Sequence, residues 1–224
     1  MPSSLSNKTI LITGASGILG QAVNAAALAA GARTALIDHG RHPADSRGAA
    51  IVRSGVDLSD EAAAATAVNA IVAAVGKIDV LLNIAGGFEW AKVETASVDL
   101  WTRLYRTNVL SAVGAIKATL AYFARPALIV NVAAATAGHA AVGMAPYTAA
   151  KAGVLRLTEA ASQELADRDI RVYSVSPTIL DTPRNRADLP QADTSRWIAP
   201  ATLARAMLEL WNDPSPSGRD FRFG

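Results

Sequence analysis

A run of small residues at positions 13–20 constrains the fold of this chain more than any other stretch. It follows the apolar, β-branched residues 9–12, which predict a buried parallel strand. It precedes the alanine-rich residues 21–30, which predict a helix. A strand, a glycine turn and a helix in this order can bind a pyrophosphate. The glycines let backbone N–H groups approach it closely, and the helix N-terminus adds partial positive charge.

A second apolar strand is expected at residues 34–37, and it ends in Asp38. This is the distance along the chain at which an acid that binds an adenosine ribose is expected. The Asp38 carboxylate can accept hydrogen bonds from both ribose hydroxyls, and it repels a 2′-phosphate. Neither Ala15 nor Ser16 offers a basic side chain, whereas Arg41 is close enough to bind such a phosphate. The sequence therefore favours NAD(H) as the cofactor, with NADP(H) as the alternative.

Apolar runs and helix-forming stretches alternate along the whole chain of 224 residues. Strands are expected at 9–12, 34–37, 49–56, 78–82, 127–132, 171–175 (broken by Pro177) and 219–223. Helices are expected at 21–30, from 59 or 60 to 74, from 97 or 99 to about 120, at 146–167 and at 200–211. No element is assigned to the polar residues 181–195. This alternation predicts one α/β domain over residues 1–224. Its fold is expected to be a single-domain Rossmann-type, doubly wound parallel sheet of about seven strands flanked by helices.

Composition excludes several classes of function. The formal charge is only +2 and the basic residues are scattered, so no nucleic-acid partner is expected. The absence of cysteine excludes disulfides and thiol catalysis, and the three histidines lie outside any metal-ligand spacing, so no metal is expected. Residues 1–7 are short and polar, and the most apolar window, 127–145, contains polar residues and glycines. We therefore expect a cytoplasmic protein with no membrane partner.

Tyr147 and Lys151 lie four residues apart near the start of a predicted helix, so both side chains project from one face. A free tyrosine has a pKa of about 10, too high for acid–base chemistry at neutral pH. A neighbouring lysine ammonium favours the phenolate, and a nicotinamide cation lowers the tyrosine pKa further. The pair is therefore a candidate proton donor with its support, although such a short motif also occurs on ordinary helix surfaces.

Five further features accompany this pair: the glycine-rich run 13–20, Asp38, Asp57, residues 83–86 and Asn108. With the pair, they make the chain resemble the short-chain dehydrogenase/reductase family over nearly its whole length. The resemblance implies three catalytic residues. Tyr147 exchanges a proton with the substrate oxygen, Lys151 holds the nicotinamide ribose and lowers the pKa of Tyr147, and Asn108 organises a relay water. It also implies cofactor contacts from Gly14, Ser16, Gly17, Ile18, Leu19, Gly20, Asp38, Asp57, Leu58, Asn83, Ala85, Gly86, Tyr147, Lys151, Pro177 and Thr182.

One departure from the family pattern bears on catalysis. The family normally has a serine about thirteen residues before the tyrosine, where its hydroxyl polarises the substrate carbonyl, and Ala134 occupies that position here. Losing one preorganised donor costs on the order of 10²–10³ in rate. Thr136 is nearby but is expected to point elsewhere. The departure leaves open a carbonyl or alcohol substrate at a weakened site, or an NAD(H)-binding sensor without catalysis.

Dihydropteridine reductases, one branch of this family, resemble the chain in lacking that serine while keeping the tyrosine and the lysine. Residues 84–88 also resemble the aromatic-bearing loop of that branch, and residues 180–197 resemble its substrate flap, expected here at about 178–198. The resemblance implies transfer of hydride and a proton to a quinonoid dihydropterin, a delocalised imine that depends less on a carbonyl-polarising hydroxyl. An NAD(H)-dependent reductase of this type is the leading hypothesis.

Three aromatic side chains, Phe88, Trp90 and Trp197, lie in predicted loops at the carboxyl edge of the sheet, where open α/β folds bind ligands. They are candidates for stacking on a flat substrate, and the alternative is that they anchor loops. With Ala134 and Thr136 they complete the substrate candidates. Two long predicted helices, from about 101 to 120 and from 147 to 167, carry small residues that permit close packing. The resemblance implies that they pair between subunits, giving a homodimer or homotetramer that acts on a small molecule.

Overall fold

The computed structural model describes residues 5–40, 46 and 48–224, so the prediction about Arg41 lies outside it. Seven parallel strands form one sheet in the order β3-β2-β1-β4-β5-β6-β7. The strands are β1 (Thr9–Thr13), β2 (Arg33–Ile37), β3 (Ile51–Arg53), β4 (Ile78–Asn83), β5 (Phe123–Val132), β6 (Ile170–Pro177) and β7 (Asp220–Phe223). This is the predicted doubly wound sheet, whose order reverses between β1 and β4. Ligands of such folds bind at that reversal, beyond the carboxyl ends of the strands.

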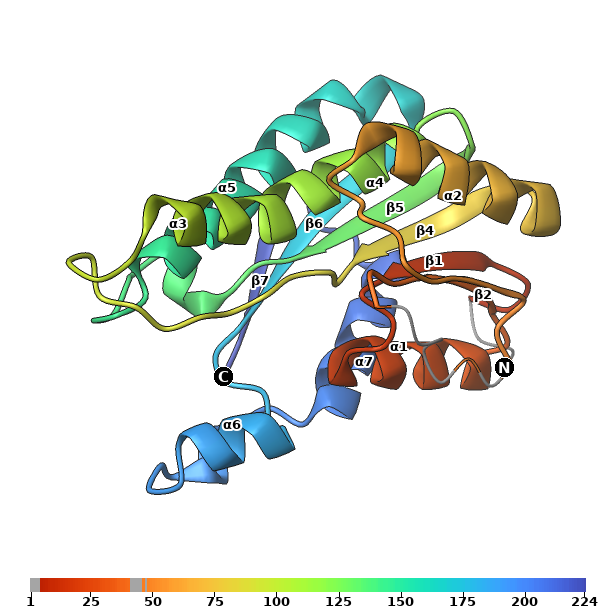
Figure 1. Ribbon diagram of the computed structural model, residues 1–224. Helices are drawn as coiled ribbons and strands as arrows, with labels where there is room; N and C mark the ends of the chain where they lie inside the picture. The colour runs from red at the N-terminus through yellow and green to blue at the C-terminus, as the bar shows by residue number, and fades with distance from the viewer. Residues whose placement is uncertain (1–4, 41–45, 47) are drawn as a thin grey trace.

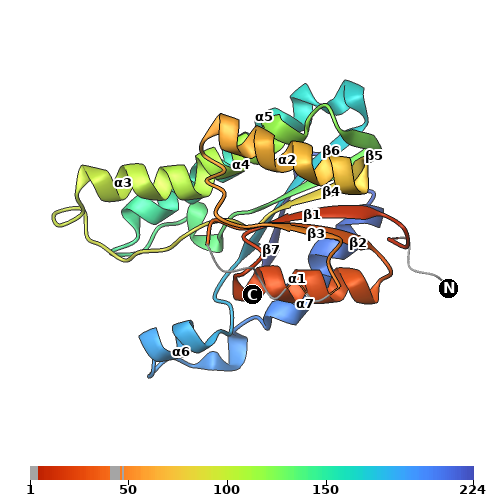
Figure 2. The ribbon, with the colours of Figure 1, turned by 45° about the vertical axis from the view of Figure 1, so that its right-hand side comes forward.

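Helices cover both faces of the sheet (Figure 1). One face carries α1 (Ile18–Ala29) and α7 (Pro200–Glu209), which contact each other, and the other carries α2 (Glu61–Val75), α4 (Ser111–Thr119) and α5 (Ala145–Glu164). Figure 2 shows the same three layers after a turn of 45° about the vertical axis. Two apolar clusters fill the spaces between sheet and helices. The β1 strand is buried at every residue, as its continuous apolar run predicts for a sheet covered on both faces.

Three predicted strands have different bounds in the structure. The β3 strand covers three residues rather than 49–56, because it pairs only with β2 and the chain turns at Gly55, whose N–H donates to the Gly40 carbonyl. The β5 strand begins four residues before the predicted start. Pro177 does not break β6, since it is the last residue of the strand and pairs with Phe223. A proline at a strand end costs little because few ladder hydrogen bonds remain to be made there.

The long helix predicted to end near residue 120 is divided in three. It begins as α3 (Val98–Tyr105), passes through a π-helical turn (Arg106–Leu110), and continues as α4. Asn108 lies in this turn, and its Nδ2 donates to the Leu104 carbonyl at 2.9 Å and to the Gly87 carbonyl at 3.0 Å. Such turns are rare and frequent at functional sites. The interruption therefore fixes Asn108 against the loop after β4.

The substrate-flap region contains a short helix that the sequence did not predict. α6 (Pro183–Asp188) lies within the polar segment 181–195, capped by Thr182, whose Oγ1 accepts from the Asn185 N–H at 3.1 Å. It projects from the three layers below the carboxyl edge of the sheet (Figure 1). The following helix, α7, ends at Glu209 and continues as a single 3-10 turn. No helix within the described residues is long and apolar enough to cross a membrane.

Candidate active site

A cavity of about 1080 Å³ lies at the carboxyl edge of the sheet, beside the reversal of strand order. It is lined by most of the expected cofactor residues, namely Gly14, Ser16, Gly17, Ile18, Leu19, Gly20, Asp38, Asp57, Leu58, Ala85, Gly86, Tyr147, Lys151 and Thr182. Asn83 and Pro177 lie outside its lining. Asn83 instead donates from Nδ2 to Asn131 Oδ1 at 2.9 Å, and so joins β4 to β5 inside the sheet.

The glycine-rich turn is held tightly against the loop after β4. Gly14 has a φ of +65°, and a Cβ there would lie 2.7 Å from the Ala85 nitrogen, so only glycine fits. Thr13 Oγ1 accepts from the N–H groups of Ile84 and Ala85, both at 3.1 Å. Gly17 begins α1 without a side-chain cap, and the first turn has no acidic residue. The helix N-terminus therefore keeps its partial positive charge for an anion in the cavity.

Asp38 lies at the end of β2 and is 7% exposed. Its Oδ2 accepts from the Ser16 N–H and its Oδ1 from the Gly40 N–H, both at 2.8 Å. The carboxylate thus links the glycine-rich turn to β2, and it also lines the cavity. It places a negative charge beside the turn that faces the cofactor. The wall of the cavity therefore carries a carboxylate at this point.

Asp57 forms a second acidic position of the cavity. Its Oδ1 accepts from the Ser59 Oγ at 2.6 Å and from the Ser59 N–H at 2.9 Å, and its Oδ2 pairs with Arg106 at 3.0 Å. The hydrogen bonds from Ser59, with the charge of Arg106, hold the pKa of Asp57 below its usual value. Arg106 begins the π-helical turn that contains Asn108, so this ion pair joins Asp57 to that turn, and all three residues line the cavity.

Two of the three expected catalytic residues, Asn108 and Lys151, meet at Gly86, and the third, Tyr147, lies beside Lys151. Lys151 is buried, and its Nζ donates to the Val132 carbonyl at 2.8 Å and lies 5.9 Å from the centre of the Tyr147 ring. A Cβ at Gly86 would lie 2.7 Å from Asn108 Oδ1 and 3.3 Å from Lys151 Nζ. Asn108 Oδ1 also accepts from the Gly87 N–H at 3.2 Å. Asn108, which is distant in the sequence, therefore lines the same cavity as Tyr147 and Lys151.

Burial dominates the pKa values of the tyrosine and the lysine. Desolvation raises the pKa of Tyr147 to about 12 and lowers the pKa of Lys151 to about 8. The sequence led us to expect a lowered tyrosine pKa, but in the protein without a cofactor the pKa of Tyr147 is raised. The physical reason is that burial disfavours the phenolate more than a lysine at this distance favours it. The phenol is thus protonated at neutral pH and can donate its proton.

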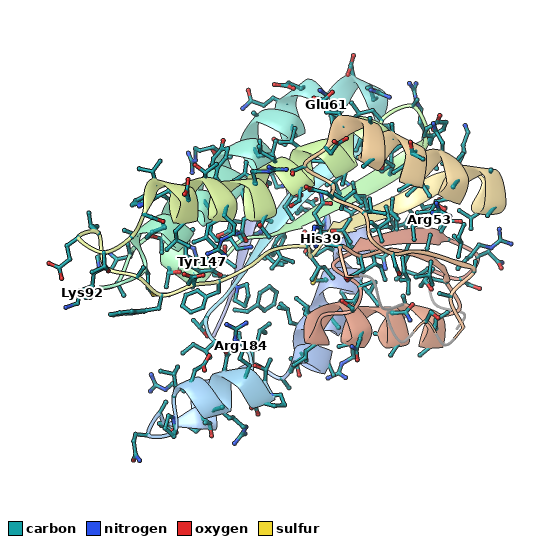
Figure 3. All side chains as sticks on the ribbon, in the orientation of Figure 1. His39, Arg53, Glu61, Lys92, Tyr147 and Arg184 are labelled. Carbon is teal, nitrogen blue, oxygen red and sulfur yellow. The ribbon has the colours of Figure 1, made fainter. Side chains whose placement is uncertain are left out.

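The substrate end of the cavity is formed by aromatic and flap residues. The Phe88 ring meets Tyr147 edge-on, with 4.9 Å between ring centroids. Leu180 and Arg184 line the same cavity and had no distinguishing signal in the sequence beyond their place in the flap. Tyr147 and Arg184 line this cavity from α5 and α6, and Figure 3 shows Arg184 on the side of α6 toward the sheet.

The other four substrate candidates, Trp90, Ala134, Thr136 and Trp197, lie outside the cavity lining. Ala134 is buried, and its carbonyl accepts from the Ala137 N–H at 2.9 Å. The Thr136 Oγ1 is buried and has no hydrogen-bond partner. Trp90 is bonded to the loop after β5, since its Nε1 donates to the Val142 carbonyl at 3.2 Å.

Comparison with known proteins gives consistent results. A family model described as "short chain dehydrogenase" matches residues 8–193. The meso-2,3-butanediol dehydrogenase of Serratia marcescens is 31% identical, over 79% of this chain and 72% of its own. A protein of Xanthobacter autotrophicus named inactive 2-(S)-hydroxypropyl-CoM dehydrogenase 2 is 36% identical, over 84% of this chain and 85% of its own. The NADH complex of a 3-ketoacyl-(acyl-carrier-protein) reductase from Brucella melitensis aligns with a TM-score of 0.82 and 27% identity, over 98% and 97% of the two chains.

Proposed function

This chain belongs to the short-chain dehydrogenase/reductase family, and we propose that it transfers hydride between NAD(H) and a small molecule, with Tyr147 as the proton donor. One observation carries the proposal. A single cavity joins the uncapped N-terminus of α1 and the Asp38 carboxylate at one end to Tyr147, Lys151 and Asn108 at the other. Such a cavity fits a dinucleotide whose reactive ring lies beside a proton donor.

Each residue has a defined task in this proposal. The turn at residues 13–20 binds the diphosphate, Asp38 accepts from the ribose hydroxyls, and Asp57 with Leu58 holds the adenine. The nicotinamide supplies or accepts the hydride when bound. Tyr147 donates its phenolic proton to the substrate, and Lys151 stabilises the phenolate that forms. Asn108, held by Gly87, supports the return of a proton from solvent to the phenol.

NADH rather than NADPH is the proposed cofactor. Asp38 is buried beside the glycine-rich turn, where a 2′-phosphate would meet its negative charge at close range. The Brucella reductase that shares this fold was solved with NADH, which supports the proposal by analogy.

Two substrate classes are candidates. Relatives named as diol or alcohol dehydrogenases favour a small alcohol or its carbonyl form. Ala134 favours a quinonoid dihydropterin, because an alanine at this position cannot polarise a carbonyl by hydrogen bonding. A third candidate is a dinucleotide sensor without turnover, supported by Ala134 and by the relative that is named inactive.

A substrate panel separates the three. Oxidation of NADH is measured with quinonoid dihydropterin and with small ketones, and reduction of NAD⁺ with 2,3-butanediol and cyclic alcohols, each repeated with the phosphorylated cofactor. Turnover of a ketone or an alcohol supports the first class, and turnover of the dihydropterin supports the second. Micromolar NADH binding without any turnover favours the sensor and contradicts the proposed hydride transfer.

We also propose that the chain assembles as a homodimer or homotetramer. A groove of about 400 Å³ between α3 and α5 is lined by Trp101, Tyr105, Leu110, Pro146 and Ala149, among others. The small residues that first suggested pairing are used partly inside the chain, since a Cβ at Gly114 would overlap the Leu58 carbonyl oxygen. Sedimentation at micromolar concentration tests the assembly, and a monomer would contradict it.

A further inference from the structure

Two loops that flank the cavity are joined to each other directly. One follows β4 and covers residues 84–97, and the other follows β5 and covers residues 133–144. The Ala91 N–H donates to the Gly143 carbonyl at 2.8 Å, and the Trp90 Nε1 donates to the Val142 carbonyl at 3.2 Å. The second of these bonds shows that Trp90 is bonded to a loop far away in the sequence.

Gly143 provides the surface on which the Trp90 indole packs. A Cβ at Gly143 would lie 2.0 Å from Trp90 Cε2 and 2.2 Å from Nε1, so no other residue fits without moving the ring. Gly143 is buried although its neighbour Val142 is 78% exposed. Its φ of +75° also favours glycine. We call this packing, with its two hydrogen bonds, the Trp90–Gly143 contact.

The contact lies next to the proposed proton donor on both loops. Met144 caps α5, its carbonyl accepts from the Thr148 N–H and Oγ1, both at 2.8 Å, and Tyr147 is in the first turn. On the other loop, Phe88 precedes Trp90 by two residues and meets the Tyr147 ring edge-on. The Trp90–Gly143 contact therefore joins the start of α5 to the loop whose Phe88 packs on the phenol.

We propose that Trp90 is a positioning residue for Tyr147. It fixes the start of α5 through Gly143 and keeps Phe88 against the phenol, so that Tyr147 is held at one place in the cavity. This rests on the proposed function, in which Tyr147 donates the proton. The expected role of Trp90 in stacking on the substrate is not needed, because its ring packs on Gly143 and lies outside the cavity lining.

The first test compares Gly143→Ala and Trp90→Ala with a matched control, Gly76→Ala. Gly76 has a φ of +80°, close to that of Gly143, but nothing lies within 4 Å of a Cβ built there, so Gly76→Ala also places an alanine at positive φ without touching the indole. We expect kcat to fall about 10- to 100-fold in the first two variants, because small misplacements of a reacting group cost this much. The Kd for NADH should stay within about two-fold. Gly76→Ala should keep the kcat of the wild type.

Two further variants separate positioning from general damage. Trp90→Phe keeps a ring on Gly143 and should recover most of the lost kcat. The double variant Trp90→Ala/Gly143→Ala should have the kcat of Trp90→Ala alone, because the overlap with the indole is gone and the two effects share one cause. In Trp90→Ala the pKa of Tyr147 in the pH profile of kcat should fall. The reason is that the burial that raises this pKa decreases when Phe88 moves away from the phenol.

Hydrogen exchange supplies a readout that does not depend on turnover. In Trp90→Ala we expect the Ala91 amide and the first-turn amides of α5 to exchange at least about 10-fold faster than in the wild type. If kcat and exchange both match the wild type, or if Gly76→Ala loses as much activity as Gly143→Ala, the proposed role of Trp90 is wrong. Retained turnover in Tyr147→Phe would instead overturn the proposed function, and the exchange rates would still test the contact.

Discussion

Single residues carry the proposals about the cofactor and the substrate. Asp38 has both carboxylate oxygens bonded to backbone N–H groups, so its position is fixed beside the glycine-rich turn. A fixed charge discriminates more sharply than a mobile one because it cannot move away from an approaching phosphate. Ala134, at the position where the family usually has a serine, carries no hydroxyl; it is buried and lies outside the cavity lining.

Replacing Asp38 tests the cofactor preference. Asp38→Asn removes the charge but keeps an oxygen that accepts from one backbone N–H. We expect the ratio of NADPH Kd to NADH Kd to fall about 10-fold, which corresponds to about 1.4 kcal/mol of lost repulsion. Fluorescence titration with both cofactors measures the ratio, and a thermal melt checks that the variant is folded. An unchanged ratio would refute the role of Asp38.

Restoring the missing hydroxyl tests the substrate class. If the substrate is a ketone, Ala134→Ser should raise kcat, by as much as about 10²-fold, because a new donor stabilises the oxyanion. If the substrate is a dihydropterin, kcat should change little. Steady-state kinetics with the substrate identified by the panel distinguishes the two, and a loss of activity would show that a serine is not accommodated at position 134.

At the scale of elements, the π-helical turn is the feature that the chemistry depends on most. It places Asn108 so that its side chain donates to two carbonyls and accepts from one N–H, which fixes the loop after β4 against the helix. Through Asn108 the turn is bonded to Gly87, and the neighbouring Gly86 lies close to Lys151, since a Cβ there would be 3.3 Å from Nζ.

Asn108→Ala should lower both stability and rate. Two part-buried hydrogen bonds to the Gly87 backbone are lost, each worth about 0.5–1.5 kcal/mol, so we expect the free energy of unfolding to fall by about 1–3 kcal/mol and kcat to fall by at least about 10-fold. Ser97→Ala is the control, since Ser97 caps α3 through the Leu100 N–H and lies outside the cavity lining. It should cost about 1 kcal/mol of stability without changing kcat. If the two variants have equal kcat, Asn108 has no role beyond stability.

The elements also show what could be predicted from the sequence. The strands, the helices between them and the glycine-rich turn could be predicted from local patterns. Apolar runs predict strands, alanine-rich stretches predict helices, and glycines predict turns. The π-helical turn, α6 and the Trp90–Gly143 contact could not be predicted. Each depends on contacts between residues far apart in the sequence, such as Asn108 with Gly87 or Trp90 with Val142. The raised pKa of Tyr147 was missed for the same reason, because burial is set by packing.

At the scale of the whole molecule, the burial of Lys151 in the cavity lowers the free energy of unfolding of the chain. Lys151 is buried and its pKa is lowered to about 8 by desolvation. The folded chain therefore binds fewer protons than the unfolded chain between about pH 8 and the usual lysine pKa of 10.5, and its stability rises with pH across that window. Below that window the unfavourable contribution of the buried ammonium is fully present.

Lys151→Met measures this contribution. The variant removes the titration and leaves the Val132 carbonyl without its donor, a loss that does not depend on pH. The unfolding free energy of the wild type minus that of the variant should rise by about 3 kcal/mol in total between about pH 8 and 10.5. Denaturant titrations without cofactor at three pH values provide it. A difference that is flat with pH would mean that Lys151 has an ordinary pKa in the folded chain.

The central claim is that Tyr147 donates the proton in an NADH-dependent reduction. The most direct measurement is a single-turnover experiment that follows NADH oxidation in the wild type and in Tyr147→Phe, with the substrate that the panel identifies. Phe keeps the edge-on packing with Phe88 and loses only the hydroxyl. We predict that hydride transfer slows by about 10²–10⁴-fold while the NADH Kd stays the same. Equal rates in the two proteins would contradict the account.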